Sequence, residues 1–222
     1  NRQLSLVLMD FEGNQVAELE CDIGKPVHAP DDLADTLQRA LVRLAASADR
    51  SLDDISGIAI GIAGIVEADQ GMIYWSPSLS RRNVAFAQLL SDRLGRPAFV
   101  DNDANLVAVA EKSFGLGQAH SDFIVVTIEA GVGMGLVIGG ELYRGTRGCG
   151  AEFGHTKVHL DGALCRCGQR GCLEAYVADY ALLREAQTIP GAESLADPSE
   201  RIERLLGAAR DVDRFLTRND RQ

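Results

Sequence analysis

The feature that most constrains this chain is residues 154–174, GHTKVHLDGALCRCGQRGCLE, which contain three cysteines and two histidines. Cys165 and Cys167 are separated by one residue, so they are too close in sequence to pair comfortably with each other. The chain has five cysteines, and an odd number fits poorly with the disulfide framework of a secreted protein. The pattern indicates instead a reduced, cytoplasmic protein with a metal-binding loop.

Four side chains of this loop form a ligand set typical of zinc: His155, Cys165, Cys167 and Cys172. Glycines between them let the backbone fold tightly around an ion. Buried free cysteines are the plainer alternative, but a hydrophobic core does not place C-x-C-x4-C among Arg, Gln and Gly. His159 competes with His155 as the nitrogen ligand. Because four protein ligands leave no open position for an activated water, we expect the zinc to be structural and not catalytic.

Composition and charge exclude several functions. With 222 residues and a hydrophobic content of 46%, the chain is typical of a soluble globular protein with a substantial core. No apolar run approaches the ~20 residues needed to cross a bilayer, and no secretory signal opens the chain, so we expect no membrane contact. The net charge of −10 argues against a nucleic-acid-binding surface in this segment, because phosphate binding needs clustered Lys and Arg.

Hydrophobic periodicity and turn residues predict both strands and helices. The predicted strands are 4–10, 15–21, 56–64, 97–103, 122–128 and 133–143, with a hairpin turn at 11–14. The predicted helices are one that begins at Pro30 and others over 84–94, 104–114, 173–187 and 198–217. Residues 114–118, FGLGQ, are typical of a hinge. We therefore expect a mixed α/β fold with an N-terminal lobe over 1–117 and a C-terminal lobe over 118–222.

Residues 154–174 match every fixed position of a zinc signature, G-H-x6-G-x2-C-x-C-G-x2-G-C-x-E, and Glu152 fits the G-E-x-G-H that leads into it. Residues 101–105, DNDAN, fit (E/D)-N-D-A-N, and residues 61–64 lie at a G-x-P-G turn, with alanine in place of the proline. These motifs resemble those of the ROK family of bacterial sugar kinases and sugar-responsive repressors, and the resemblance covers residues 3–180. It implies an actin-like, hexokinase-like (ribonuclease H-like) two-lobed fold with a sugar in the cleft and a zinc-binding loop.

The resemblance also implies which side chains contact the sugar. The implied set is Asn102, Asp103, Glu152, His155 and Glu174. Carboxylates and an amide are suitable partners for vicinal hydroxyls, because a sugar needs several directional hydrogen bonds. His155 would bind zinc through one ring nitrogen and the sugar through the other, so the metal would fix the tautomer of the ring and its direction.

Some members of this set have plainer alternatives. Asp103 precedes a predicted helix, where Asp is a common N-cap. Glu174 has the character of an ordinary acid in the first turn of a helix. Asn105 is expected to be structural. Ser78 occupies a place where kinases of the family tend to have Asn, so the sugar-binding set is expected to differ there.

This chain differs from the family's kinases at the positions of their phosphate-binding loops. The first loop, D-x-G-G-T-K, should precede the first strand, where residues 1–3 are Asn-Arg-Gln. The second should read T-x-G-T-G-x-G, but residues 127–133 place Glu129 and Ala130 there, and a carboxylate repels phosphate oxygens. A third, C-terminal element is not found before residue 222. We expect the chain to be a fragment or a shortened relative of the family.

Three hypotheses follow for the function. The first is the sugar-binding effector domain of a ROK transcriptional regulator, with a DNA-binding helix-turn-helix upstream of this chain. The second is an ATP-dependent sugar kinase, in which Asp103 would be the catalytic base and Mg²⁺ would accompany ATP. The third is a relic domain that keeps the zinc and the fold but binds no small molecule. The resemblance further implies a homodimer or homotetramer.

Overall fold

The computed structural model describes residues 3–186 of the chain. These residues belong to two compact units, each of which is discontinuous in sequence. Within the described residues, unit 1 comprises 3–125 and 135–151, and unit 2 comprises 126–134 and 152–186. The predicted boundary between lobes at residue 117 stays a prediction, because compact packing alone does not define a lobe.

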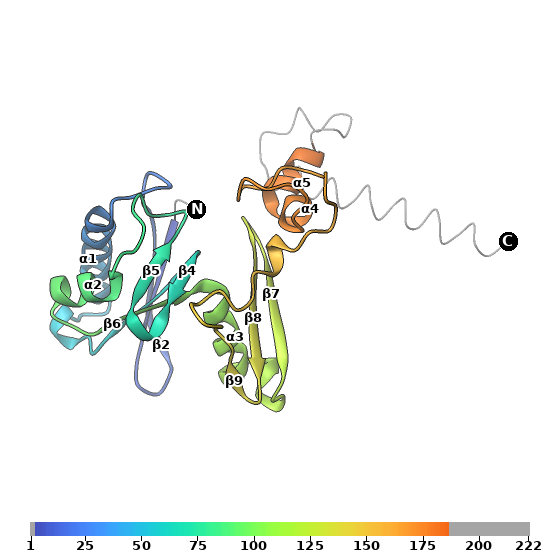
Figure 1. The fold of residues 1–222 in the computed structure, drawn as a ribbon. Helices are drawn as coiled ribbons and strands as arrows, with labels where there is room; N and C mark the ends of the chain where they lie inside the picture. The colour runs from blue at the N-terminus through green and yellow to red at the C-terminus, as the bar shows by residue number, and fades with distance from the viewer. Residues whose placement is uncertain (1–2, 187–222) are drawn as a thin grey trace. The chain divides into compact units, whose positions relative to one another are not determined.

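Unit 1 begins with the predicted hairpin (Figure 1). β1 (Gln3–Met9) pairs antiparallel with β2 (Gln15–Asp22). The connecting turn is held by the Asp10 carboxylate, which accepts hydrogen bonds from the backbone N–H groups of Glu12 and Asn14, both at 2.9 Å. An Asp that bonds to the backbone two residues on is a common turn former, and the predicted hairpin is therefore confirmed.

The core of unit 1 lies between two helices and short strands. α1 (Pro30–Ser47) and α2 (Phe86–Leu94) contact each other, and α2 also contacts β6 (Ala98–Asn102) (Figure 1). β6 pairs in parallel with β3 (Ile58–Ile62). The buried apolar cluster comprises Leu33, Ala34, Leu37, Ile62, Val66, Ile73, Leu79, Phe86, Leu90, Ala98 and Val100. Leu33 and Leu37 of the helix predicted to begin at Pro30 thus face the core, at the spacing of one helix face.

Unit 1 also contains two short strands that the sequence pattern does not indicate. β4 (Ile65–Glu67) and β5 (Met72–Trp75) pair antiparallel, and Val66 and Ile73 are wholly buried. Strands this short carry little periodic signal, because alternation needs at least four or so residues to be recognised. The predicted helix that follows β6 is confirmed as α3 (Asp103–Phe114).

A three-stranded sheet follows α3, in the order β7-β8-β9. It consists of β7 (Phe123–Ile128), β8 (Val132–Ile138) and β9 (Glu141–Leu142). The prediction of one strand over 133–143 is wrong, because the chain reverses at Gly139 and Gly140. Both glycines have positive φ, 58° and 80°, which is the backbone of a two-residue hairpin turn.

Unit 2 contains two short helices, α4 (Glu174–Val177) and α5 (Asp179–Ala186). It also contains the predicted metal-binding loop, residues 154–174, which is called the metal-like loop below. The predicted single helix over 173–187 is broken at Ala178, whose backbone is extended. The N–H of Asp179 donates to the carbonyl of Glu129 in the β7–β8 turn, at 2.9 Å. A bond to a distant residue thus replaces a bond within the helix. The predicted helix over 198–217 lies outside the described residues.

Four short 3-10 turns complete the described chain: η1 (Leu52–Asp54), η2 (Ala68–Gln70), η3 (Leu116–Ala119) and η4 (Phe153–His155). Within residues 3–186, no helix has the length and apolar character required to span a membrane.

Candidate functional site

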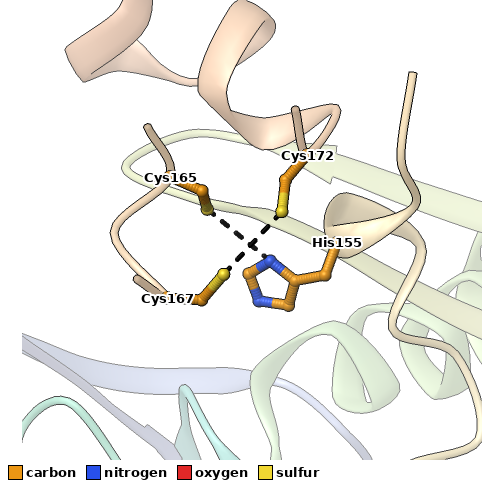
Figure 2. Close-up of side chains that lie close together, drawn as sticks. All are labelled: His155, Cys165, Cys167 and Cys172. Carbon is orange, nitrogen blue, oxygen red and sulfur yellow. Dashed lines mark hydrogen bonds between the residues drawn. The ribbon is translucent and has the colours of Figure 1, made fainter. Parts of the chain in front are cut away.

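The four predicted zinc ligands lie together in unit 2 (Figure 2). Their ligand atoms all lie within 4.8 Å of one another. The Sγ atoms of Cys167 and Cys172 are 3.7 Å apart, and Cys165 Sγ is 3.8 Å from His155 Nδ1. His159, the competing histidine, is exposed and is not part of this cluster.

These separations suit a tetrahedral metal ion. Two thiolates that are each ~2.3 Å from zinc in a tetrahedron lie about 3.8 Å apart. The observed sulfur–sulfur distance of 3.7 Å is that of such an edge. The donor set of three sulfurs and one imidazole nitrogen is also one that zinc accepts. The cluster can therefore hold a metal ion with little rearrangement.

Local backbone structure places each ligand. His155 ends the turn η4, and its Nδ1 faces the cysteines while the other ring nitrogen points away (Figure 2). Cys165 starts a tight turn in which its carbonyl accepts the N–H of Gly168, at 3.0 Å, and its N–H donates to the carbonyl of Gln169, at 2.8 Å. Cys167 lies in this turn and is exposed, whereas Cys165 and Cys172 are buried.

The cysteines differ in their electrostatic surroundings. Burial raises the pKa of the Cys165 thiol to about 12. Burial also opposes ionisation of Cys167, but the pKa of this thiol is lowered, because the Gln169 backbone and the Cys165 and Cys172 thiols bond to its sulfur. A metal binds the thiolate form, so metal binding to this cluster must release the proton of Cys165.

Glu174 lies beside the cluster and is 8% exposed. Its Oε2 accepts the backbone N–H of Val132 at 3.3 Å. Its Oε1 lies 3.4 Å from both the Cys165 thiol and the Tyr180 hydroxyl, each of which donates to it. The interpretation of Glu174 as an ordinary helix acid is therefore incomplete, because its carboxylate joins the metal-like loop to β8.

The turn between β7 and β8 carries the altered phosphate-loop residues. The N–H of Glu129 donates to the carbonyl of Gly131 at 2.9 Å, which closes a tight turn, and the Glu129 side chain is exposed. The Arg166 guanidinium donates to the carbonyl of Ala130 at 3.2 Å and lies 4.2 Å from the centre of the Tyr180 ring. The sequence pattern indicates no role for Arg166 or Tyr180, because their contacts depend on residues distant in the chain.

Asn102 and Asp103 lie in unit 1, where β6 meets α3. Asn102 caps the helix, since its Oδ1 accepts the N–H of Asn105 at 3.2 Å, and its Nδ2 donates to the carbonyl of Gly64 at 3.0 Å. The alternative that Asp103 is the N-cap is therefore wrong. Asp103 is the first residue inside the helix, and its exposed carboxylate accepts the N–H of Ala104 at 2.9 Å.

An ion pair between buried Asp101 and half-buried Arg144 lies next to these residues and was not predicted. Asp101 is 6% exposed, and its Oδ2 accepts from Nε and Nη2 of Arg144, at 3.0 and 2.7 Å. Its Oδ1 accepts from the backbone N–H of Asn102 at 2.7 Å and from the side chain of Asn105 at 3.1 Å. Asn105 is buried within this network, in agreement with its predicted structural role. Asp101 thus fixes the end of β6 on which Asn102 and Asp103 are carried.

The remaining predicted residues lie in loops. Glu152 is exposed and directly precedes η4 in unit 2. Ser78 is partly buried in unit 1, and its N–H donates to the hydroxyl of Ser76 at 3.1 Å. The predicted sugar-binding set is thus divided: Asn102 and Asp103 belong to unit 1, and Glu152, His155 and Glu174 belong to unit 2.

Comparison with known proteins gives a family and two kinds of relative. The model of the ROK family matches residues 2–216. The xylose repressor of Bacillus subtilis is 32% identical over 184 residues, which cover 82% of this chain and 47% of the repressor. The glucokinase of Streptomyces coelicolor is 40% identical over 134 residues, which cover 60% of this chain and 42% of the glucokinase. The chain spans about half the length of these relatives.

Solved structures give the same two kinds of relative. A ROK family glucokinase from Streptomyces griseus, in complex with glucose and AMPPNP, has a TM-score of 0.73 and 33% identity, over 84% of this chain and 57% of the glucokinase. A ROK family transcriptional regulator, a homolog of the E. coli MLC protein, has a TM-score of 0.73 and 28% identity, over 84% of this chain and 46% of the regulator. The likeness confirms the predicted α/β fold of the actin-like, hexokinase-like kind.

Proposed function

Since the chain belongs to the ROK family, we propose that it is the sugar-binding effector domain of a ROK transcriptional regulator. The observation that carries this proposal is the exposed carboxylate of Glu129 in the β7–β8 turn. Similarity to a xylose repressor over 82% of the chain supports it. In this function the domain binds a sugar or a sugar derivative and transfers no phosphate.

Glu129 and its neighbour alter a turn that in a kinase must accept phosphate. A phosphate oxygen needs backbone N–H groups, hydroxyls or cations around it. Here the carboxylate repels phosphate, the Ala130 side chain has no hydroxyl, and the N–H of Glu129 is already bonded to the carbonyl of Gly131. Arg166 donates to the carbonyl of Ala130 at 3.2 Å, and this contact holds the turn in its present form.

The proposed sugar-binding residues are Asn102, Asp103, Glu152, His155 and Glu174. Asp103 is the best supported, because its carboxylate is exposed and uses Oδ1 for one backbone bond, which leaves Oδ2 for a hydroxyl. The Asn102 side chain makes two bonds within the protein, so we assign it mainly to holding the end of β6. Glu174 loses the donor at Cys165 once that thiol ionises, and its Oε1 then has capacity for a sugar hydroxyl.

We further propose that the metal is zinc and that its role is structural. Three cysteines and His155 make a closed ligand set, with no position left for a reactive water. The Nδ1 of His155 faces the cysteines, so Nε2 is the nitrogen that would bond to a sugar hydroxyl (Figure 2). Zinc would supply a fixed ring orientation there, and the sugar contacts would come from the protein.

The wider assembly is also part of the proposal. DNA contact is assigned to a segment outside this domain, because the charge of −10 makes the domain a poor partner for DNA. We assign the protein to the cytoplasm, since reduced cysteines are needed for the metal centre, and propose a homodimer or homotetramer.

Two measurements test the function. Calorimetric titration with hexoses, pentoses and N-acetylated sugars is expected to give binding of one sugar class. A coupled ADP-release assay with the same sugars and MgATP is expected to give no turnover. Both should be made on the full-length protein as well as on this chain. Sugar-dependent ADP release would overturn the regulator proposal, and lack of binding by the full-length protein would favour a relic domain.

The alternative function is an ATP-dependent sugar kinase. The observation that favours it is the 40% identity with the Streptomyces coelicolor glucokinase over 134 residues. Asp103 would then take the proton of the attacking hydroxyl, with Mg²⁺ bound to ATP. The ADP-release assay separates the two functions, since a kinase variant Asp103→Asn would lose turnover and the regulator has none to lose.

A further inference from the structure

Lys157 lies directly opposite the metal ligand Cys172 in the main chain. The two residues form an isolated antiparallel β-bridge, and their neighbours make backbone hydrogen bonds of 2.8 and 2.9 Å on either side of it. Directly opposed residues in such a pair have Cβ atoms about 4.5–5.5 Å apart. The backbone therefore holds the two side chains next to each other, whatever the flexibility of the lysine stem.

The lysine side chain uses this position to reach the ligand sulfur. Lys157 Nζ lies 2.9 Å from Cys172 Sγ. Cys172 is 0% exposed, whereas Lys157 is an exposed residue, so the contact joins a residue at the surface to a buried sulfur. Position 157 is not a fixed position of the zinc signature, and the contact is thus a property of this chain beyond the four ligands.

The net charge of the proposed metal centre indicates what the contact between Lys157 and Cys172 does. A divalent metal with three thiolates and a neutral imidazole carries one net negative charge. Glu174 adds a carboxylate 3.4 Å from Cys165 Sγ. Net negative charge in a partly buried site is unfavourable unless a cation or hydrogen-bond donors offset it. The ammonium of Lys157 supplies both a positive charge and a donor, at a ligand sulfur.

We propose that Lys157 is an outer-sphere residue of the metal centre, whose ammonium donates to the Cys172 thiolate, offsets the negative charge of the centre and slows the loss of the metal. The inference rests on the zinc centre of the proposed function. It predicts that Cys172 is less reactive toward electrophiles than a zinc-bound cysteine without such a donor, because electron density on its sulfur is drawn to the ammonium.

The test compares Lys157→Met, which keeps the length of the stem without the charge, with Lys157→Arg, which keeps the charge and a donor. Lys25→Met is the matched control, since it removes the same charge from unit 1, where Lys25 lies 3.4 Å from Asp32. Transfer of zinc to a colorimetric chelator gives the affinity and the rate of release. Lys157→Met is expected to lower zinc affinity about tenfold or more, as the loss of outer-sphere partners generally does.

Lys157→Arg and Lys25→Met are both expected to stay close to the wild type. A second readout is alkylation by iodoacetamide with mass spectrometry, in which Cys172 should react faster in Lys157→Met than in the wild type. If Lys157→Met is not folded by circular dichroism, Lys157→Gln replaces it, since it keeps a neutral donor but loses the charge.

The outcomes distinguish the two levels of inference. If the purified wild-type protein contains no zinc and takes none up, the proposal of a metal centre is wrong, and so is the proposed role of Lys157. A zinc-loaded wild type whose Lys157→Met variant releases zinc at the wild-type rate overturns the role of Lys157 alone. Faster release from Lys25→Met to the same extent as from Lys157→Met would reduce the effect to overall charge and would also overturn it.

Discussion

Unit 1 encloses an apolar cluster whose wholly buried members include Phe86, Leu90 and Ile73, whereas the buried cluster of the described part of unit 2 is Cys165, Cys172 and Ala175. Burying one large apolar side chain contributes about 1.5–3 kcal/mol. Two of the three buried residues in the unit 2 cluster belong to the proposed metal site, and zinc binding contributes about 10–16 kcal/mol in small zinc domains. Unit 1 is thus stabilised by packing, and we expect unit 2 to depend on its metal.

Hydrogen bonds between distant residues also hold unit 2 together. In unit 2 the hairpin turn, the metal-like loop and α5 are joined by Glu174, Arg166 and the backbone of Asp179. Such bonds contribute about 0.5–1.5 kcal/mol each, so they orient the loop more than they stabilise it. The described part of unit 2 buries few apolar side chains, and a bound metal would cross-link its loop and stabilise the folded form.

The largest expected effect comes from removing a metal ligand. Cys165→Ser, or chelation of the metal, should abolish zinc binding and expose the region around 152–186 to proteases, while the apolar core of unit 1 resists. Zinc content and mass spectrometry of proteolytic fragments give the measurement. Cys149→Ser is the control, because Cys149 is an exposed cysteine of unit 1 outside the ligand set. Full zinc content in Cys165→Ser would show that Cys165 is not a ligand and would contradict the proposed dependence of unit 2 on this metal site.

The next effect is a loss of packing in unit 1. Phe86→Ala empties a fully buried position, and we expect a loss of about 3–5 kcal/mol in the free energy of unfolding. Phe99→Ala is the control, since Phe99 is 63% exposed, and its cost should be near 0.5 kcal/mol or below, roughly that of a surface change. Urea denaturation measures both. Zinc content should stay unchanged, and its loss in Phe86→Ala would show that the two units are not stabilised separately.

A smaller effect concerns the sugar. Asp103→Asn should weaken binding by about 1.5–3 kcal/mol, or roughly tenfold and more in Kd. The helix cap is retained, because it belongs to Asn102. Calorimetry with the sugar that binds the wild type measures the change, with zinc content as a check and Asp69→Asn, on the exposed surface of unit 1, as the control. Equal affinity in wild type and Asp103→Asn would leave the residue without a role in recognition.

The smallest effect tests whether the loop of unit 2 has stability apart from its metal. The Tyr176 hydroxyl accepts the N–H of Ala163 at 2.9 Å, and the ring packs on the Cys165 cluster. Tyr176→Phe keeps the ring and should cost about 1 kcal/mol, measured by thermal unfolding of the zinc-loaded protein. Tyr143→Phe, at a 49% exposed tyrosine of unit 1, is the control. A loss of zinc in Tyr176→Phe would mean that this bond positions the ligands.

Elements whose signals are local can be predicted from the amino-acid sequence. Helix α1 follows from leucines at helical spacing after Pro30, and the β1–β2 hairpin follows from two alternating strands around a polar turn. The clustering of His155 with Cys165, Cys167 and Cys172 was also predictable, because the three cysteines lie within eight residues and this donor set is typical of zinc sites. Position 139–140 carried a local signal too, a pair of glycines, which the prediction of one continuous strand overlooked.

Features that join residues distant in the chain depend instead on tertiary contacts. The break at Ala178 depends on a bond from Asp179 to Glu129, and the burial of Asp101 depends on Arg144, which is 43 positions away. The N-cap of α3 is Asn102 and not Asp103, because the helix begins one residue earlier than the sequence pattern indicated. A hydrogen bond or an ion pair forms only when folding brings its two partners within about 3 Å, and local sequence does not encode that approach.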